Sequence, residues 1–331
     1  MEGITPLLVF VLLLTLWAEF VNGSTDAPNA IATIVSTKVL SPKRAVVLAT
    51  ALNILGTFSG TAVAATIGQG IVNPEIISLQ TVAAAMVGII LWSSVAWKYG
   101  LPTSESHALI SGLAGAGFAV GGFRSLEWEG WKKVLIGLGF STFLGFILAY
   151  LIFVAIVWIF NKKGISKVRK IFGKLQILSA GFMAFGHGSN DGQKFIGAFS
   201  LALLLAGVTK EFTVPVWVIF LCAGMMGLGT SIGGWRIIKT MGMKLSRLEP
   251  QHGFAAETAA ATAIEIASRF GIPLSTTHTI NTAIMGVGSA QHFSGVRWQI
   301  AKNIIFAWIL TFPICAFISW GVAKIFLLFG S

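Results

Sequence analysis

The sequence predicts an all-α integral membrane protein made of two repeats with inverted topology. Of its 331 residues, 55% are hydrophobic and only 11% are charged, whereas soluble domains carry about 25% charged residues. Apolar runs of about 17–25 residues, the length that spans a bilayer, recur along the chain. Two polar motifs of the first half return in the second half in the same order. An ordinary soluble protein is therefore excluded.

The apolar segments form two series separated by a basic stretch, "NKKGISKVRK". In the first series they are 5–21 joined to 27–37, 44–68, 76–98, 104–122 and 132–160. In the second they are 175–187 joined to 191–207, 213–234, 251–270, 275–290 and 299–329. With broken or re-entrant helices counted, we expect roughly 10–12 membrane segments. The chain should divide into repeat 1 (1–160), a cytoplasmic basic linker (161–174) and inverted repeat 2 (175–331), which together form one structural unit.

The charged loops predict the orientation. If each interrupted segment crosses the membrane once, each series crosses five times, so the two series point in opposite directions. Lys and Arg are in excess in cytoplasmic loops. The basic loops 38–44, 161–174 and 235–247 then lie inside, and both termini lie outside. The net charge of +11 is thus explained by short loops, and we expect no nucleic-acid partner. The opening stretch "MEGITP" lacks Lys and Arg, so we expect no cleaved signal peptide.

An acidic motif opens each series. "GSTDAPN" at 23–29 matches "GSNDGQK" at 188–194, which aligns Asp26 with Asp191. A charge at membrane depth costs at least about 2.5–3.5 kcal/mol, so each carboxylate should have a partner. Carboxylate, amide and backbone oxygens suit a hard cation. The alternatives are an Asp that caps the next half-helix and an ion pair between Asp191 and Lys194.

A hydroxyl motif follows in each series. "LPTSESHALISGLAGAG" at 101–117 matches "IPLSTTHTINTAIMGVG" at 272–288. Pro followed by Ser or Thr marks a helix start, where free N–H groups and the helix dipole attract an anion. Ordinary N-capping of two buried helices is the alternative. Matched motifs in inverted repeats are typical of secondary transporters. The alignment pairs Ser104 with Ser275, Ser106 with Thr277 and His107 with His278.

Other ionisable residues in the apolar segments are candidates for coupling or gating, because such groups are costly at membrane depth. These candidates are Glu105, His107, Lys194, Glu257 and His278. Glu105 and His107 either exchange protons or pair with each other. Glu19 and Glu265 lie at membrane depth or at an interface. Cys222 and Cys315 have neither disulfide nor metal spacing, and we expect no cofactor.

Four stretches resemble the bacterial inorganic-phosphate transporter family. They are "NGSTDAPNAIATIVSTKVLSP", "LPTSESHALISG", "AFGHGSNDGQKFIG" and "IPLSTTHTINTAIMGVG", and the resemblance runs from about 18 to 290. Members of this family have inverted repeats and move phosphate with Na⁺ or H⁺, and some relatives carry sulfate. The resemblance therefore implies a secondary active transporter that works by alternating access.

The resemblance also implies roles for the motif residues. The Na⁺ ligands would be Asp26, Asn29, Asn190 and Asp191. The phosphate ligands would be Ser104, Ser106, Ser275, Thr276 and Thr277, with Asp26 and Asp191. The chain departs from the family pattern at two positions. Thr25 stands where eukaryotic relatives have Asn, and Lys194 replaces another Asn, so the resemblance leaves Na⁺ and H⁺ both open.

We therefore predict a multi-pass plasma-membrane protein that carries out cation-coupled phosphate symport, with Na⁺ favoured over H⁺. A sulfate or other oxyanion permease is the alternative within this fold, and an anion channel is the alternative of another class. "GTSIG" at 229–233 fits G-x-S-x-G, but the strand–turn–helix context of a hydrolase is missing, so we expect no enzyme. Gly229 and Gly233 also form G-x-x-x-G, which favours close helix packing. A homodimer is a candidate assembly.

Overall fold

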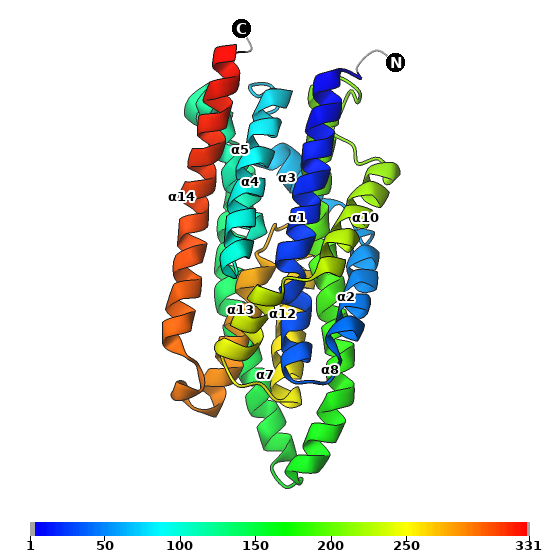
Figure 1. The fold of residues 1–331 in the computed structure, drawn as a ribbon, viewed down its shortest axis with the longest axis vertical. Coiled ribbons are helices and arrows are strands. Elements are labelled where there is room, and N and C mark those ends of the chain that lie inside the picture. The colour runs from blue at the N-terminus through cyan, green and yellow to red at the C-terminus, as the bar shows by residue number, and fades with distance from the viewer. Residues whose placement is uncertain (1–3, 330–331) are drawn as a thin grey trace.

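The computed structural model describes residues 4–329, which form helices and connecting loops without a β-strand. This confirms the all-α prediction. The outermost residues of the two expected repeats, 1–3 and 330–331, lie outside the described residues, as does half of "MEGITP". The helices form an elongated bundle, and the two ends of the chain lie at the same end of it (Figure 1).

The described helices divide into two halves at the connection between α7 and α8. The first half comprises α1 (Pro6–Ser36), α2 (Pro42–Thr57), α3 (Ala62–Gly70), α4 (Leu79–Tyr99), α5 (Glu105–Gly121), η1 (Gly122–Ser125), α6 (Trp128–Gly139), η2 (Phe140–Leu144) and α7 (Gly145–Phe160). The second comprises α8 (Ile165–His187), η3 (Gly188–Gly192), α9 (Gln193–Leu205), α10 (Val216–Ile232), α11 (Trp235–Ile238), η4 (Lys239–Lys244), α12 (Pro250–Arg269), α13 (Thr276–Gln291), η5 (Phe293–Gly295) and α14 (Trp298–Phe329).

The second unit of each half is a bent helix pair. The chain bends by 68° between α2 and α3, and by 61° between α10 and the segment made of α11 and η4. Figure 1 shows that α1 starts at the end that holds both termini, whereas the α7–α8 connection lies at the opposite end. The first helices of the two halves therefore start from opposite ends of the bundle.

Five helices of the described chain are long and apolar enough to cross a membrane, or seven if each bent pair is one span. The most apolar stretch, within Trp128–Phe160, is only 22% buried. Its exposed side chains, and those of α14, are large and apolar, as shown by Trp158 at 76% and Phe317 at 71% exposure. These outer helices present the surface expected next to lipid, whereas the segments that carry the polar motifs are buried.

The interruption expected within 22–30 is absent, because α1 continues through Pro28. Pro28 has no N–H to donate to the Ser24 carbonyl, which normally weakens or kinks a helix. Close packing holds the segment: a Cβ on Gly23 would lie only 2.3 Å from the Met226 carbonyl oxygen of α10. The second acidic motif forms a π-helical turn, η3, between α8 and α9. The prediction of a broken helix was wrong for the first motif, and the second motif widens the helix locally.

The predicted G-x-x-x-G packing holds for one of its two glycines. A Cβ on Gly229 would lie 2.2 Å from the Phe20 carbonyl oxygen, so α10 contacts α1 closely there. Gly233 instead ends α10 with a φ of 70°, a left-handed conformation that favours glycine. Gly233 therefore terminates α10 and does not mediate packing against another helix.

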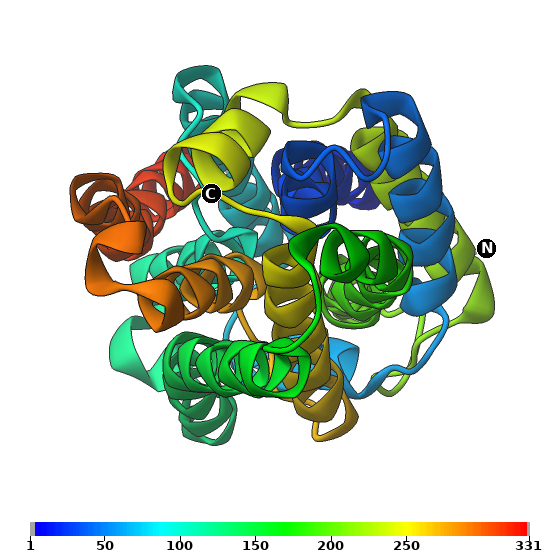
Figure 2. The ribbon, with the colours of Figure 1, turned by 90° about the horizontal axis from the view of Figure 1, so that it is seen from below.

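Two apolar clusters make up the core, and each draws on both halves. One contains Ile31 and Phe153 of the first half together with Ala255 of the second. The other contains Leu109 of the first half together with Phe199 of the second. Helices of the two halves accordingly interleave when the bundle is viewed along its length (Figure 2), with α1 against α10 and α5 against α14.

Candidate functional site

A buried polar layer lies between the two apolar clusters. On α1, core residues from Leu8 to Ala18 belong to one cluster and those from Ala30 to Val35 belong to the other. The buried polar residues of α1 between them include Glu19, Asn22, Ser24, Thr25, Asp26 and Asn29. The path through α8 and α9 repeats this arrangement, because its polar motif around Asp191 follows one cluster and precedes the other.

The starts of α5 and α13 meet in this layer. Ser104 caps α5 by accepting a hydrogen bond from the His107 N–H at 3.3 Å, and Ser275 caps α13 by accepting from the His278 N–H at 3.1 Å. The Ser275 hydroxyl donates to the Ser104 Oγ at 2.8 Å. Both helix starts are thus where the sequence predicts them. Their N-terminal dipole ends converge at one point.

The hydroxyls one and two residues beyond Ser275 connect the start of α13 to the acidic motifs. Thr277 donates to Asp26 Oδ1 at 3.3 Å, and Thr276 donates to Asp191 Oδ2 at 2.6 Å. The Asn29 amide donates to Thr276 at 3.1 Å and to Thr277 at 2.9 Å. The two motif types that the sequence singles out are therefore in direct contact, with partners 85 residues apart for Asp191 and Thr276 and 247 residues apart for Asn29 and Thr276.

The two aligned carboxylates differ in their surroundings. Asp26 is 3% exposed, and its Oδ2 has no hydrogen-bond partner among residues 4–329. Asp191 is fully engaged: Oδ1 pairs with the Lys194 ammonium, and Oδ2 accepts from Thr276 and lies 3.3 Å from His187 Nε2. The ion pair considered from the sequence is thus present. Ligand atoms of Asp26, His187 and Asp191 all lie within 4.8 Å of one another.

Asn190 has a different environment from the other expected cation ligands. Its Nδ2 donates to Ser268 Oγ at 2.9 Å and to the Ile272 carbonyl at 3.2 Å. Its Oδ1 accepts from the Leu274 N–H at 3.2 Å. The amide therefore fastens the loop that precedes α13. This loop sets the position of the hydroxyl motif.

The side chains of Glu105 and His107 have separate partners, although the sequence suggested that they either exchange protons or pair with each other. Glu105 accepts hydrogen bonds from Thr25 at 3.0 Å and from Ser93 at 2.5 Å. His107 instead packs edge-on against His278, with ring centroids 4.5 Å apart. These two residues are equivalent in the repeat alignment, so the repeats also meet through their histidines.

The remaining candidate carboxylates lie outside the contact between helix starts. Glu257 accepts from Thr33 at 2.5 Å and from Gln176 at 3.0 Å, and it also accepts from Ser179. Thr33 lies seven residues beyond Asp26 on α1, about 10 Å along the helix at 1.5 Å per residue. Glu257 therefore belongs to a satisfied network at another depth of the bundle.

The other two carboxylates, Glu265 and Glu19, each accept a hydrogen bond from a nearby side chain. Glu265 accepts from Ser189 at 3.0 Å and pairs with Arg269 at 3.4 Å. Glu19 accepts from Asn22 at 2.9 Å, three residues along α1.

Sequence reasoning missed three residues of the polar layer. His187 lies beside Asp191, and its Nδ1 is 3.2 Å from Asn53 Oδ1. Ser93 holds Glu105. The spacing of His187 four residues before Asp191, on one face of a helix, was a usable signal. Ser93 and Asn53 gave none, because only the tertiary fold brings them to their partners.

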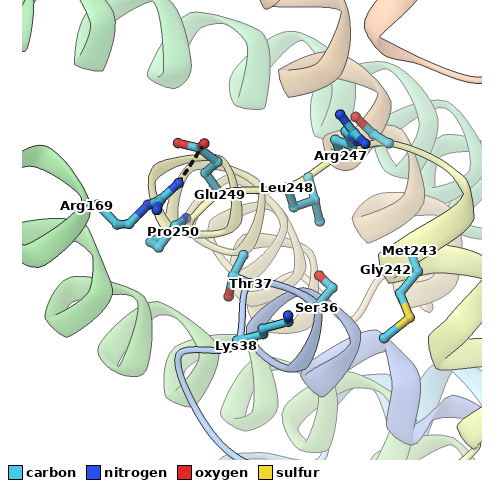
Figure 3. Close-up of a pocket in the computed structure, with 11 residues that line it drawn as sticks. Ser36, Thr37, Lys38, Arg169, Gly242, Met243, Arg247, Leu248, Glu249 and Pro250 are labelled. Carbon is cyan, nitrogen blue, oxygen red and sulfur yellow. Dashed lines mark hydrogen bonds and ion pairs between the residues drawn. The ribbon is translucent and has the colours of Figure 1, made fainter. Parts of the chain in front are cut away.

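A separate cavity of about 580 Å³ opens at the end of α1, in the region of the basic loops. Figure 3 shows Lys38, Arg169 and Arg247 around it, with Arg169 paired to Glu249 at 3.0 Å. The hydrogen bond from Gln251, followed by the Arg169 guanidinium, holds the pKa of Glu249 below its ordinary value. Lys38 is twelve residues from Asp26, about 18 Å along a helix, so this cavity is distinct from the polar layer.

Comparison with known proteins identifies the family. The family model described as "Phosphate transporter family" matches residues 22–319. A "Probable low-affinity inorganic phosphate transporter" of Rhizobium meliloti is 46% identical over 95% of both chains, and one of Bacillus subtilis is 39% identical over 96% of both.

A solved structure, described as "The sodium-dependent phosphate transporter", superposes with a TM-score of 0.87 at 24% identity, over 98% of this chain and 100% of that one. This likeness shows a shared fold. The relatives and the fold are those of transporters and not of enzymes, and the apolar helices are those of a multi-pass plasma-membrane protein. The chain belongs to the phosphate transporter family.

Proposed function

We propose that this protein carries inorganic phosphate across the plasma membrane together with a coupling cation, by alternating access. One observation carries the proposal: the helix starts capped by Ser104 and Ser275 meet at 2.8 Å, directly beside the carboxylates Asp26 and Asp191. Donors for an anion and acceptors for a cation are thereby placed together inside the membrane. This arrangement supports coupled transport, because two bound charges of opposite sign offset each other.

The phosphate site comprises the two helix starts and their hydroxyls, Ser104, Ser106, Ser275, Thr276 and Thr277. Backbone N–H groups and hydroxyls at helix N-termini bind oxyanions. These N–H and O–H donors bind sulfate as readily as phosphate. The neighbouring carboxylates favour phosphate, because a protonated phosphate donates a hydrogen bond to Asp26 or Asp191 and sulfate cannot. A site built to receive such a donor discriminates strongly against a ligand that lacks it.

The coupling cation binds at the acidic motifs, with Asp26 as the principal ligand. Asp26 Oδ2 is buried and free of hydrogen bonds within the described chain, and Asn29 lies one helical turn away. Oxygen ligands suit a hard cation such as Na⁺. Na⁺ is favoured over H⁺ because the solved structure of the same fold is described as sodium-dependent.

Alternating access follows from the arrangement of the polar layer. Apolar clusters lie on both sides of it, so substrate reaches the layer only when one cluster opens. The first helices of the two halves start from opposite ends of the bundle (Figure 1), which supports two halves of inverted topology. Exchange of conformations between the halves then opens the site to one side at a time.

The test is phosphate uptake by the purified protein in sealed liposomes. An inward Na⁺ gradient should concentrate labelled phosphate inside, and dissipating the gradient should abolish this accumulation. A channel would only equilibrate phosphate, whatever the Na⁺ gradient. If a proton gradient alone drives accumulation, H⁺ is the coupling cation. Equal inhibition by sulfate and unlabelled phosphate would instead indicate a general oxyanion permease.

A further inference from the structure

We propose that the Lys194 ammonium is a tethered cation that occupies the cation site of the second repeat, so that only the Asp26 site takes a free coupling cation. This inference rests on the proposed cation-coupled transport and concerns how many cations take part. It starts from the repeat alignment, in which Lys194 corresponds to Asn29 and Asp191 to Asp26. One repeat thus has an amide where the other has a permanent positive charge.

The contacts of Lys194 are those of a bound metal cation. Its Nζ contacts Asp191 Oδ1, Ser106 Oγ and, at 2.8 Å, the Leu274 carbonyl oxygen. A carboxylate, a hydroxyl and a backbone carbonyl form an all-oxygen set of the kind that hard cations take. The set combines Ser106 from the first repeat with Leu274 and Asp191 from the second. The ammonium therefore connects the two halves at the level of the polar layer.

Lys194 is also unsuited to act as a direct ligand of phosphate. A lysine ammonium has three N–H donors and no acceptor, and here three protein oxygens take them. The side chain is 1% exposed, and so is Asp191. A buried charge without a partner is strongly unfavourable, so the pair is held together by the burial of both groups. The positive charge of Lys194 is thus directed at protein oxygens.

The first repeat lacks this tethered charge. Asn29 uses its amide on Thr276 and Thr277, which leaves Asp26 with a single 3.3 Å hydrogen bond at Oδ1. No hydrogen bond reaches Asp26 Oδ2 from residues 4–329. Asp191 and Lys194 form a neutral ion pair, whereas Asp26 forms no salt bridge with any residue of the described chain. A second mobile cation at Asp191 would meet the ammonium at close range and be repelled.

The test compares the number of bound Na⁺ ions in the wild type and in Lys194→Asn. This variant gives the second repeat the amide of the first. Labelled Na⁺ binding to the purified full-length protein in detergent needs no transport, so its result is independent of whether the proposed symport is correct. Lys194→Asn should bind one more Na⁺ than the wild type. Lys194→Arg is the matched control, because it keeps the charge and should keep the wild-type number.

The reciprocal variant, Asn29→Lys, should bind one Na⁺ fewer than the wild type. In liposomes, the ratio of Na⁺ to phosphate taken up should rise by one in Lys194→Asn, whatever its wild-type value. An unchanged Na⁺ number in Lys194→Asn overturns the proposal.

If Lys194→Asn unfolds in choline chloride, its melting temperature in NaCl becomes the readout. Stabilisation by Na⁺ beyond that of the wild type is expected, and its absence equally overturns the proposal. A wild type that binds Na⁺ but accumulates no phosphate would contradict the proposed symport and leave the Lys194 result standing.

Discussion

At the scale of single residues, the hydroxyls of Ser104 and Ser275 touch each other at 2.8 Å while each caps its own helix. If both face one bound phosphate, Ser104→Ala and Ser275→Ala should each weaken the same binding event. A hydrogen bond to a charged group contributes about 1.5–3 kcal/mol, so each variant should lose about ten-fold or more in phosphate affinity. The measurement is the phosphate concentration that half-saturates uptake.

Ser294→Ala is the control for this pair, because Ser294 is an exposed residue of the short helix η5, outside the polar layer. Loss of an N-cap also costs about 1 kcal/mol of stability, so the melting temperature of each variant must be followed in parallel. Unchanged affinity in both cap variants, with uptake otherwise intact, would rule out a shared anion site.

Asp26 is the residue on which cation coupling should depend most directly. Replacing it by Asn removes the charge and keeps the shape, so Asp26→Asn should fold and should lose Na⁺-driven accumulation of phosphate. Glu75→Gln makes the same chemical change at an exposed position and should behave as the wild type. Accumulation by Asp26→Asn at the wild-type level would show that the carboxylate is not a cation ligand.

At the scale of elements, α1 and α10 approach closely enough to exclude side chains. A Cβ on Gly23 would lie 2.3 Å from the Met226 carbonyl oxygen, and backbone cannot give way as a flexible side chain can. Gly23→Ala should therefore destabilise the protein by about 1–3 kcal/mol, the usual cost of overpacking. Thermal unfolding in detergent measures the effect.

Gly224→Ala, on α10, provides the comparison. A Cβ there has no neighbour within 4 Å, and Ala favours the helix over Gly. This variant should be at least as stable as the wild type. Equal melting temperatures for the Gly23 and Gly224 variants would contradict the close contact between α1 and α10.

The elements also show what the sequence could and could not predict. The ranges 104–122 and 275–290 anticipate α5 (Glu105–Gly121) and α13 (Thr276–Gln291) to within a residue, because a capping Ser is a local signal. The unbroken course of α1 through Pro28 was not predictable, because packing against α10 overrides the local preference of Pro.

The candidate site also has a part that the sequence could predict and a part that it could not. Its motif residues were identifiable because ionisable groups and hydroxyls stand out in an apolar sequence. The partners of these residues were not identifiable. Glu105 lies next to Thr25 and Ser93 instead of His107, and the amide of Asn190 holds the loop at Ile272. Such pairings depend on helix rotation and tilt, which hydropathy does not encode.

At the scale of the whole molecule, the distribution of basic loops predicts which end of the bundle faces the cytoplasm. The α7–α8 connection lies at the end opposite the two termini (Figure 1). Gly164→Cys, in that connection, should react with a membrane-impermeant maleimide only after cells are permeabilised. Lys210→Cys, in the α9–α10 loop, should react in intact cells. Both positions are exposed, whereas native Cys222 and Cys315 are buried and should give little background.

The opposite labelling pattern would invert the orientation but leave the fold unchanged. Labelling of both positions in intact cells would contradict a single membrane crossing by the path from α8 to α9. The result of this labelling experiment is therefore independent of the results for the site variants.

The long-range contacts of α1 have a consequence for biosynthesis. Asp26 receives its hydrogen bond from Thr277, 251 residues later in the chain, and Asn29 bonds to the same segment. When α1 leaves the ribosome and enters the membrane, Asp26 and Asn29 therefore precede their partner Thr277 by 251 and 248 residues of synthesis. Until α13 is inserted, α1 needs water, lipid headgroups or an insertion factor to shield these groups. The pace of synthesis of the second half thus determines how long the first half remains exposed to quality control.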